Sequence, residues 1–348
     1  MKILNNRIGG GKMRQSNMEA LRIVAMSMIL IHHFMVHGLG AANIPCNLYY
    51  IINPFVYCGV NIFFLITGHF SIRYSFRGLT KFVLGILYFG IINILLTYLA
   101  GSPVTPKSIV GTILFPVSMS PYWFIQVYLL LMASAPLLNA GLNALTRVQF
   151  RNTLIVITFL VLYMRGGHAS HTYFQAVYFY CLGFYFRTSD TSRIFSPNAL
   201  LIIFLTSCAI NGLLDFISLQ IRHQAIGYFT LYNNIFVIVG AISLYLLFSK
   251  FNFTSPIINR IATASLGCYL LQDGRFGFSF IYDFQSSFLE THGYGWDLVG
   301  MLIACFLLYW ISSYIFTRFE NLWINNLTDR ILDVTHNFFK IIPIRLRP

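Results

Sequence analysis

The chain has 348 residues, of which 57% are hydrophobic and only 9% are charged. A soluble domain has about 25% charged residues, so this composition excludes an ordinary soluble protein and indicates a polytopic membrane protein. The net charge of +13 does not predict nucleic-acid binding, because the basic residues are scattered between apolar segments.

Ten apolar runs predict an all-α membrane protein with about ten transmembrane helices. In chain order the runs are 20–38, 50–70, 80–100, 121–139, 152–165, 172–187, 198–217, 228–248, 259–281 and 297–317. We expect a basic cytoplasmic segment at 1–18, a transmembrane domain at 19–320 and a basic cytoplasmic tail at 321–348. The mixed composition of that tail suits an amphipathic helix on the membrane surface.

The basic residues also predict the orientation. With the N-terminus in the cytoplasm, 18 of the 23 Lys and Arg residues fall on the cytoplasmic side and 4 on the other, while Arg22 lies inside the first span. Cytoplasmic loops carry an excess of Lys and Arg, so this asymmetry favours an even number of spans with both termini in the cytoplasm. We therefore expect a multi-pass protein of the inner (cytoplasmic) membrane, surrounded by lipid.

The first span carries ionisable residues, which are costly in lipid and commonly functional. His33 follows Arg22 by 11 residues, which is three helical turns plus roughly 20°, so the two side chains share a face about 16 Å apart along the axis. Glu19 and His37 lie near the same face, whereas His32 is rotated away by about 100°. The sequence therefore predicts one ionisable stripe that runs from the cytoplasmic edge into the bilayer.

This stripe allows two readings. Its members could be buried polar groups that fix helix packing. Alternatively, a histidine in the membrane interior can act as a general base near neutral pH, and an arginine at the cytoplasmic edge suits a donor that bears phosphate. His33 and His37 have no third candidate ligand, so no metal site is predicted.

The segment around the stripe resembles the first-helix signature of the acyltransferase-3 family of membrane O-acyltransferases. Glu19, Arg22 and His33 match that signature position by position. The resemblance covers roughly residues 17 to 320, with further similar segments at GVNIFFLITGHF (59–70), PYWFIQVYLLLMASAPLLN (121–139), YCLGFYFR (180–187) and SLGCYLLQD (265–273).

This resemblance implies a function. Such proteins move an acyl group, usually acetyl, from cytoplasmic acyl-CoA to a sugar hydroxyl of a surface polysaccharide or a lipid-linked glycan, without a metal. His33 and Glu19 are then the expected catalytic residues and Arg22 a donor-site residue. Whether His33 acts as a general base or carries the acyl group is left open.

The sequence departs from the family pattern at two places: the residues expected to bind the acyl donor, and the position of Gln272. Many members carry Arg-x-x-Arg at the start of the third helix, whereas Arg73, Arg77 and Lys81 stand here at four-residue intervals. They could meet the CoA phosphates from one helical face or form an ordinary cytoplasmic charge cluster. Relatives often have histidine at the position of Gln272, before Asp273. We expect both residues to bind substrate.

The start of the fourth span offers further substrate-binding candidates. Trp123 could stack on a sugar ring or anchor the helix at the membrane interface, and Gln126 lies about one turn deeper. The family resemblance implies acyl-CoA, a glycan or glycolipid acceptor and polysaccharide assembly proteins as partners.

Two other functions remain open. The stripe could serve a proton-coupled transporter, although no inverted repeat is evident. The protein could also be a non-catalytic scaffold of a polysaccharide assembly complex, which the Gln272 departure would permit.

Overall fold

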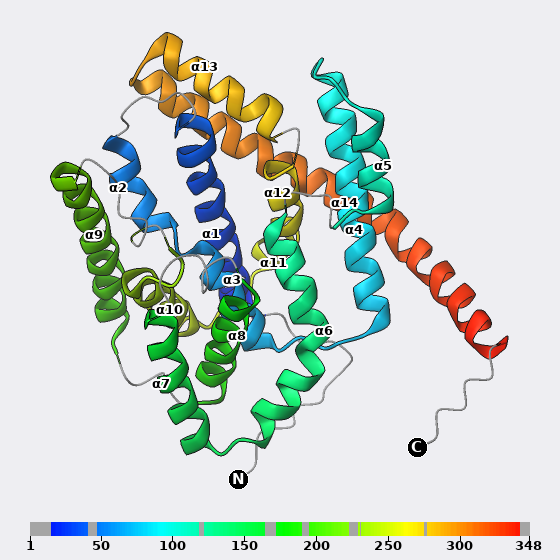
Figure 1. Cartoon of the computed structure of the whole chain (residues 1–348), viewed down its shortest axis with the longest axis horizontal. Coiled ribbons are helices and arrows are strands. Elements are labelled where there is room, and N and C mark those ends of the chain that lie inside the picture. The colour runs from blue at the N-terminus through cyan, green and yellow to red at the C-terminus, as the bar shows by residue number, and fades with distance from the viewer. Residues whose placement is uncertain are drawn as a thin grey trace.

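The computed structural model describes residues 15–40, 47–117, 122–163, 172–189, 195–222, 229, 231–274 and 277–341. Within these residues every regular element is a helix (Figure 1). The predicted all-α class is confirmed.

The first half of the bundle comprises α1 (Ser16–His33), the π-helix η1 (Phe34–Leu39), α2 (Asn47–Val56), α3 (Gly59–Phe70), α4 (Phe76–Leu99), α5 (Pro106–Leu114) and α6 (Trp123–Ala144). The second half comprises α7 (Arg147–Tyr163), α8 (Tyr173–Thr188), α9 (Pro197–Arg222), α10 (Ile235–Ser249), α11 (Pro256–Ala262), α12 (Ser265–Gln272), the π-helix η5 (Gly277–Tyr282), α13 (Asp283–His292) and α14 (Trp296–Ile341).

Each predicted span corresponds to helical structure, but not every one is long enough to cross a membrane. In the described part of the chain, six helical segments have the necessary length and hydropathy: Ser16–Leu39, Tyr49–Phe70, Phe76–Leu99, Trp123–Ala144, Pro197–Ile221 and Trp296–Thr335. The other predicted spans correspond to the shorter helices α7, α8 and α10 and to the interrupted series α11, α12 and η5. Helix length and hydropathy thus support six spans, and the predicted number of about ten is not reproduced.

Residues 321–341 of the predicted tail continue the helix of the last predicted span. Helix α14 continues for 46 residues to Ile341, because the sequence from 301 to 341 contains neither glycine nor proline to end it. Its C-terminal part leaves the bundle at the lower right of Figure 1. The ion pair between Arg77 and Asp329 joins that part of α14 to α4.

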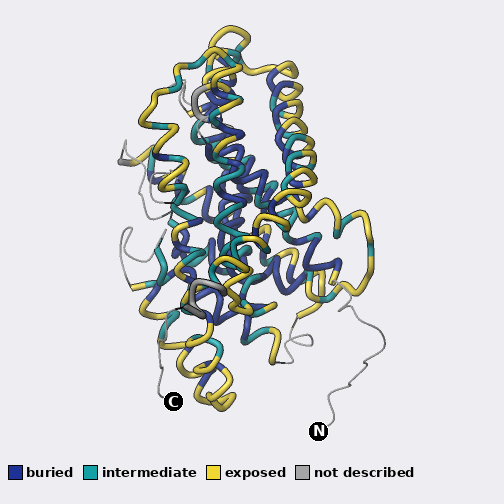
Figure 2. The backbone as a smooth tube through the Cα atoms, turned by 90° about the vertical axis from the view of Figure 1, so that its right-hand side faces the viewer, coloured by how far each residue is buried: buried dark blue, intermediate teal, exposed yellow. Residues whose placement is uncertain are grey.

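Helix α1 lies in the interior of the bundle, where its neighbours are α2, α3, α10, α11 and α12. Figure 2 shows buried backbone along this centre and exposed backbone at the periphery. The large apolar side chains at the surface, such as Phe159 and Leu137, are 70% and 79% exposed, as expected for a surface that faces lipid. The helix with the ionisable stripe is therefore held by packing on several sides.

Two glycines allow α3 and α8 to pack with their backbones in contact. A Cβ atom added at Gly68 would overlap the backbone of Tyr180, and one added at Gly183 would overlap the backbone of Leu65. Small residues allow such close approach between membrane helices. This packing explains why the family-like segments 59–70 and 180–187 contain Gly68 and Gly183.

We expect Gly68→Ala to destabilise the protein by about 1–3 kcal/mol, since the methyl group meets backbone that cannot rotate away. The measurement is the unfolding midpoint of the purified protein in detergent. Gly300→Ala is the matched control, because nothing lies within 4 Å of a Cβ atom added at this glycine in α14. Equal midpoints for the two variants would contradict this account of the α3–α8 contact.

Candidate functional site

A cavity of about 440 Å³ lies between α1 and the helices packed around it. Helix α1 contributes Arg22, Met26, Ile29 and His33, which follow one another at intervals of three or four residues. Arg22 and His33 therefore share one face, as their spacing predicts. The other walls consist of Val60, Phe63, Ile66, Thr67, Gly78, Phe82, Trp123, Phe124, Tyr128, Met132, Tyr232, Ala262, Thr263, Ser265, Leu266 and Tyr269.

His33 stands where the winding of its helix changes. The chain is α-helical through His33 and π-helical from Phe34, and π-helical turns are frequent at functional sites. The side-chain nitrogen of Gln272, from α12, lies 3.0 Å from Nδ1 of His33. With Nδ1 engaged by Gln272, Nε2 is the ring nitrogen that remains for chemistry in the cavity.

Gln272 can support either neutral form of the imidazole. A side-chain amide has a donor nitrogen and an acceptor oxygen. Rotating the amide group by 180° exchanges the positions of these two atoms. When the oxygen faces Nδ1–H, Nε2 carries a lone pair and can accept a proton. Gln272 is completely buried, so water does not compete for this contact.

Arg22 is held by Glu19, at the other end of the cavity. A nitrogen of its guanidinium lies 2.5 Å from Oε2 of Glu19, and the two side chains are 28% and 6% exposed. Arg22 lines the cavity, whereas Glu19 does not. Glu19 precedes His33 by 14 residues, about 21 Å along the helix, so it contacts the arginine and not the histidine.

The two neighbouring histidines, His32 and His37, are not among the residues that line the cavity. Nδ1 of His32 lies 2.5 Å from the side-chain oxygen of Asn53, and its ring packs edge-on against Tyr57. The His37 ring contacts those of His33 and Tyr282, with centroids 5.3 Å and 5.6 Å apart. His37 lies in the π-helix that follows, and its ring contact with His33 keeps it near the predicted stripe.

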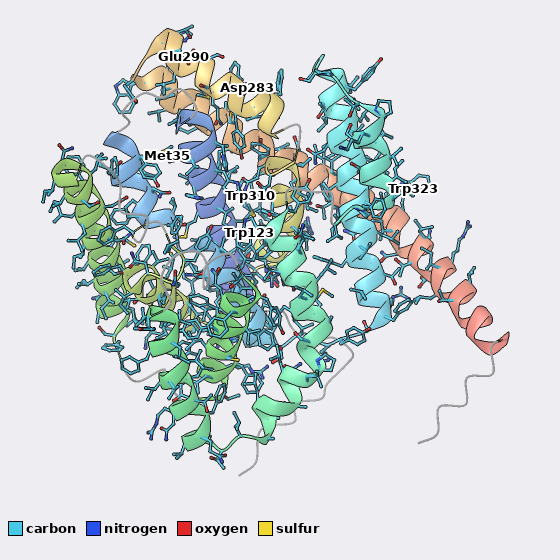
Figure 3. All side chains as sticks on the ribbon, viewed as in Figure 1. Met35, Trp123, Asp283, Glu290, Trp310 and Trp323 are labelled. Atoms are coloured by element: carbon cyan, nitrogen blue, oxygen red, sulfur yellow. The ribbon has the colours of Figure 1, made fainter. Side chains whose placement is uncertain are left out.

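An aromatic wall closes the cavity opposite α1. The ring of Trp123 stacks on Tyr232 with centroids 6.0 Å apart, and Tyr232 stacks in turn on Tyr57 at 4.6 Å. Asn61 holds this wall in place, since its side-chain nitrogen donates to the backbone oxygen of Tyr232 over 2.9 Å. Figure 3 shows Trp123 near the centre of the molecule.

The basic cluster of Arg73, Arg77 and Lys81, which begins just before α4, does not line the cavity. Arg77 pairs with Asp329, and Lys81 donates to the side-chain oxygens of Asn321 and Asn325 at 3.3 Å and 3.0 Å. Arg73 is exposed. Gly78 and Phe82 are the residues of this helix that reach the cavity.

Two other predicted substrate residues also lie outside the cavity lining. Gln126 is exposed, and its side chain donates to the backbone oxygen of Val117 over 3.2 Å. Asp273 is only 6% exposed and follows Gln272 at the end of α12.

Sequence reasoning did not single out several polar residues of the cavity lining, among them Ser265, Tyr269 and Tyr232. Ser265 and Tyr269 stand one helical turn apart on α12, and Gln272 follows after three more residues, so a periodicity test of this segment could have found them. Tyr232 lies in a connection between helices, where no periodicity marks it.

The side chains that line the cavity are mainly apolar, with one cation and several hydroxyl groups. Within the described residues no three His, Cys, Asp or Glu side chains come together as metal ligands. The cavity instead combines an arginine, several hydroxyl groups and apolar walls, and its volume is within the range of small-molecule sites.

Comparison with known protein families identifies the family of the chain. A family model described as an acyltransferase domain matches residues 15–326, a range that includes every residue lining the cavity. Searches of curated proteins and of solved structures find no match. Since the match covers most of the chain, the protein belongs to the acyltransferase-3 family of membrane acyltransferases.

Proposed function

We propose that the protein transfers an acetyl group from cytoplasmic acetyl-CoA to a hydroxyl of a cell-surface polysaccharide or lipid-linked glycan. One observation carries this proposal: Arg22 and His33 line the same cavity of about 440 Å³, at opposite ends of one helix face. The cavity thus offers a cation for a phosphate at one end and a base for a hydroxyl at the other.

The donor would enter from the side of Arg22. Gly78, Ala262 and Thr263 line the cavity there, and the positive-inside rule assigns the neighbouring segments to the cytoplasm. Arg22 would contact a donor phosphate, and Glu19 would fix the position of its guanidinium. Arg73, Arg77 and Lys81 would attract the nucleotide from outside the cavity.

His33 would act as the general base. Its Nε2 takes the proton of the acceptor hydroxyl while the hydroxyl oxygen bonds to the thioester carbonyl carbon. The carbon–sulfur bond then breaks, and the CoA thiolate receives the proton back from Nε2. Gln272 acts as a positioning residue, because it holds Nδ1 throughout.

The acceptor would approach the aromatic wall. Trp123 and Tyr232 present stacked rings beside His33, an arrangement suited to the apolar face of a sugar ring. Glu19, at the far end of α1, would influence transfer only through Arg22.

Comparison of a deletion strain with the parent strain tests the function. The O-acetyl content of the purified surface polysaccharide, measured by proton NMR, is expected to fall to background in the deletion strain and to recover on complementation. Unchanged acetylation would contradict the proposal. Proton-dependent solute uptake by vesicles that contain the protein, without any acyl-CoA, would then favour a transporter.

A further inference from the structure

Helix α14 is too long to lie entirely within the hydrocarbon core of a membrane. Its apolar part, Trp296–Thr335, has 40 residues and extends about 60 Å along the helix axis, twice the roughly 30 Å thickness of that core. Between Asp297 and Arg318 the sequence contains no charged residue, whereas several follow Arg318. The residues from Arg318 onward therefore lie where the helix leaves the core.

Contacts with α4 place this part of α14 at the cytoplasmic surface. Lys81 donates to the side-chain oxygen of Asn325 over 3.0 Å. One turn nearer the start of α4, Arg77 pairs with Asp329, which lies one turn later in α14. The positive-inside rule assigns this end of α4 to the cytoplasmic side. Figure 1 shows α14 passing obliquely beside α4, so α14 leaves the core gradually and next to its neighbour.

The face of α14 turned away from α4 carries large apolar side chains. They are Phe319, Leu322, Trp323 and Leu327, which are 54%, 67%, 73% and 46% exposed, and we call these four residues the α14 stripe. Their intervals of three, one and four residues keep them on one side of the helix. Figure 3 shows Trp323 at the edge of the molecule. Such a stripe is costly in water and suits contact with lipid.

Two arginines flank the α14 stripe. Arg318 and Arg330 are exposed, and neither forms an ion pair with a described residue. Arg318 precedes Leu322 by one turn and stands over the ring of Tyr314, 5.9 Å from its centroid. Arg330 follows Trp323 by seven residues, about two turns, and so lies on the same face. Cations at the cytoplasmic surface of a membrane are attracted to anionic lipids.

The acidic residues of this part of α14 do not neutralise the two arginines. Asp329 pairs with Arg77. Glu320 faces α4, because its carboxylate oxygen lies 2.9 Å from a Cβ atom added at Gly85. Asp333 is exposed and lies one turn beyond Arg330. The exposed charges of the described part of this segment are therefore two positive and one negative.

We propose that the α14 stripe, together with Arg318 and Arg330, binds anionic phospholipid of the cytoplasmic leaflet. The apolar side chains pack against acyl chains, Trp323 lies at the interface, where tryptophan is enriched, and the two arginines contact headgroup phosphates. This surface lies outside the cavity lining, and its lipid binding does not depend on the proposed function.

Fluorescence quenching locates the α14 stripe in the bilayer. The full-length protein is reconstituted in vesicles of phosphatidylcholine and phosphatidylglycerol that carry a quenching label either near the headgroup or near the end of the acyl chain. The chain has four tryptophans, so the difference between the wild-type protein and Trp323→Phe isolates the signal of Trp323. We expect the label near the headgroup to quench this signal more strongly.

Two outcomes of this measurement contradict the proposal. Stronger quenching by the deep label would place Trp323 in the hydrocarbon core, away from the headgroups. Absence of quenching by either label would show that protein, such as a second copy of the chain, covers the α14 stripe.

Titration of the detergent-solubilised, full-length protein with phosphatidylglycerol tests the two arginines. The rise of the unfolding midpoint with lipid concentration gives an apparent affinity, and phosphatidylcholine is the neutral comparison. Replacing both residues, Arg318→Gln with Arg330→Gln, is expected to weaken the affinity for phosphatidylglycerol about fivefold or more. The affinity for phosphatidylcholine should not change.

Arg147→Gln with Arg151→Gln is the matched control, because it removes two exposed arginines from α7, which the positive-inside rule also assigns to the cytoplasmic side. This control should keep the wild-type affinity for phosphatidylglycerol. An equal loss in both double variants would show an effect of net charge alone. An unchanged affinity after replacement of Arg318 and Arg330 would show that these residues do not bind the lipid, and either result overturns the proposal.

Discussion

Replacing His33 by alanine is expected to lower the rate of acetyl transfer about 10²- to 10⁴-fold, the usual contribution of a general base. The side chain lines the cavity and presents Nε2, because Nδ1 is engaged by Gln272. Binding of the donor should change little, since Arg22 lies about 16 Å away along the helix. The measurement is transfer of labelled acetyl from acetyl-CoA to the acceptor glycan at matched protein abundance.

His32→Ala is the matched control for this prediction. It removes a histidine from the same helical turn, and that histidine contacts Asn53 and Tyr57 outside the cavity. We expect this variant to lose stability and to keep its turnover. If the His33→Ala protein transfers acetyl groups at the normal rate, His33 is not the general base.

Substitution of Gln272 tests the role of His33 in a second way, through the turnover of the variants. Gln272→Leu keeps the size of the side chain but cannot hold Nδ1, so turnover should fall about tenfold or more. Gln272→His, which introduces the residue common in relatives, should restore most of it. A purely structural role for Gln272 predicts no such rescue.

The sequence was sufficient to predict the part of the site that lies on a single helix, α1. The intervals between Arg22, Met26, Ile29 and His33 fix a common face, because an α-helix has a constant rotation per residue. Ser265 and Tyr269 of α12 follow the same rule, so their common face could also have been predicted. The π-helical turn after His33 could not be predicted from this spacing, but His37 still lies beside His33, as the sequence predicts.

The rest of the site depends on contacts between segments far apart in the chain. Arg77 and Lys81 contact residues of α14 more than 200 positions later, and no local pattern shows that this partner exists. Tyr232 reaches the cavity because Asn61 holds its backbone. Similarly, hydropathy alone indicates ten apolar runs, whereas among the described residues six helical segments have the length and hydropathy to cross a membrane.

Removing the charge of Arg22 is expected to weaken donor binding and to destabilise the fold, and the two effects can be separated. Arg22→Met leaves the carboxylate of Glu19 buried without its partner, which should cost about 2–4 kcal/mol of unfolding free energy. The double variant Glu19→Gln with Arg22→Met has no unpaired charge and should recover most of that stability. Denaturant unfolding of the purified variants measures this difference.

Donor affinity should not recover in the double variant. If Arg22 contacts a phosphate of CoA, the loss of a charge-assisted hydrogen bond raises the KM of acetyl-CoA at least about tenfold, whether or not Glu19 is neutral. Acetyl-pantetheine has no phosphate, so its KM should be the same for the wild-type protein and the double variant. An equal rise for both donors would show that Arg22 shapes the cavity without recognising phosphate. Recovery of the acetyl-CoA KM in the double variant would show that the ion pair acts only on stability.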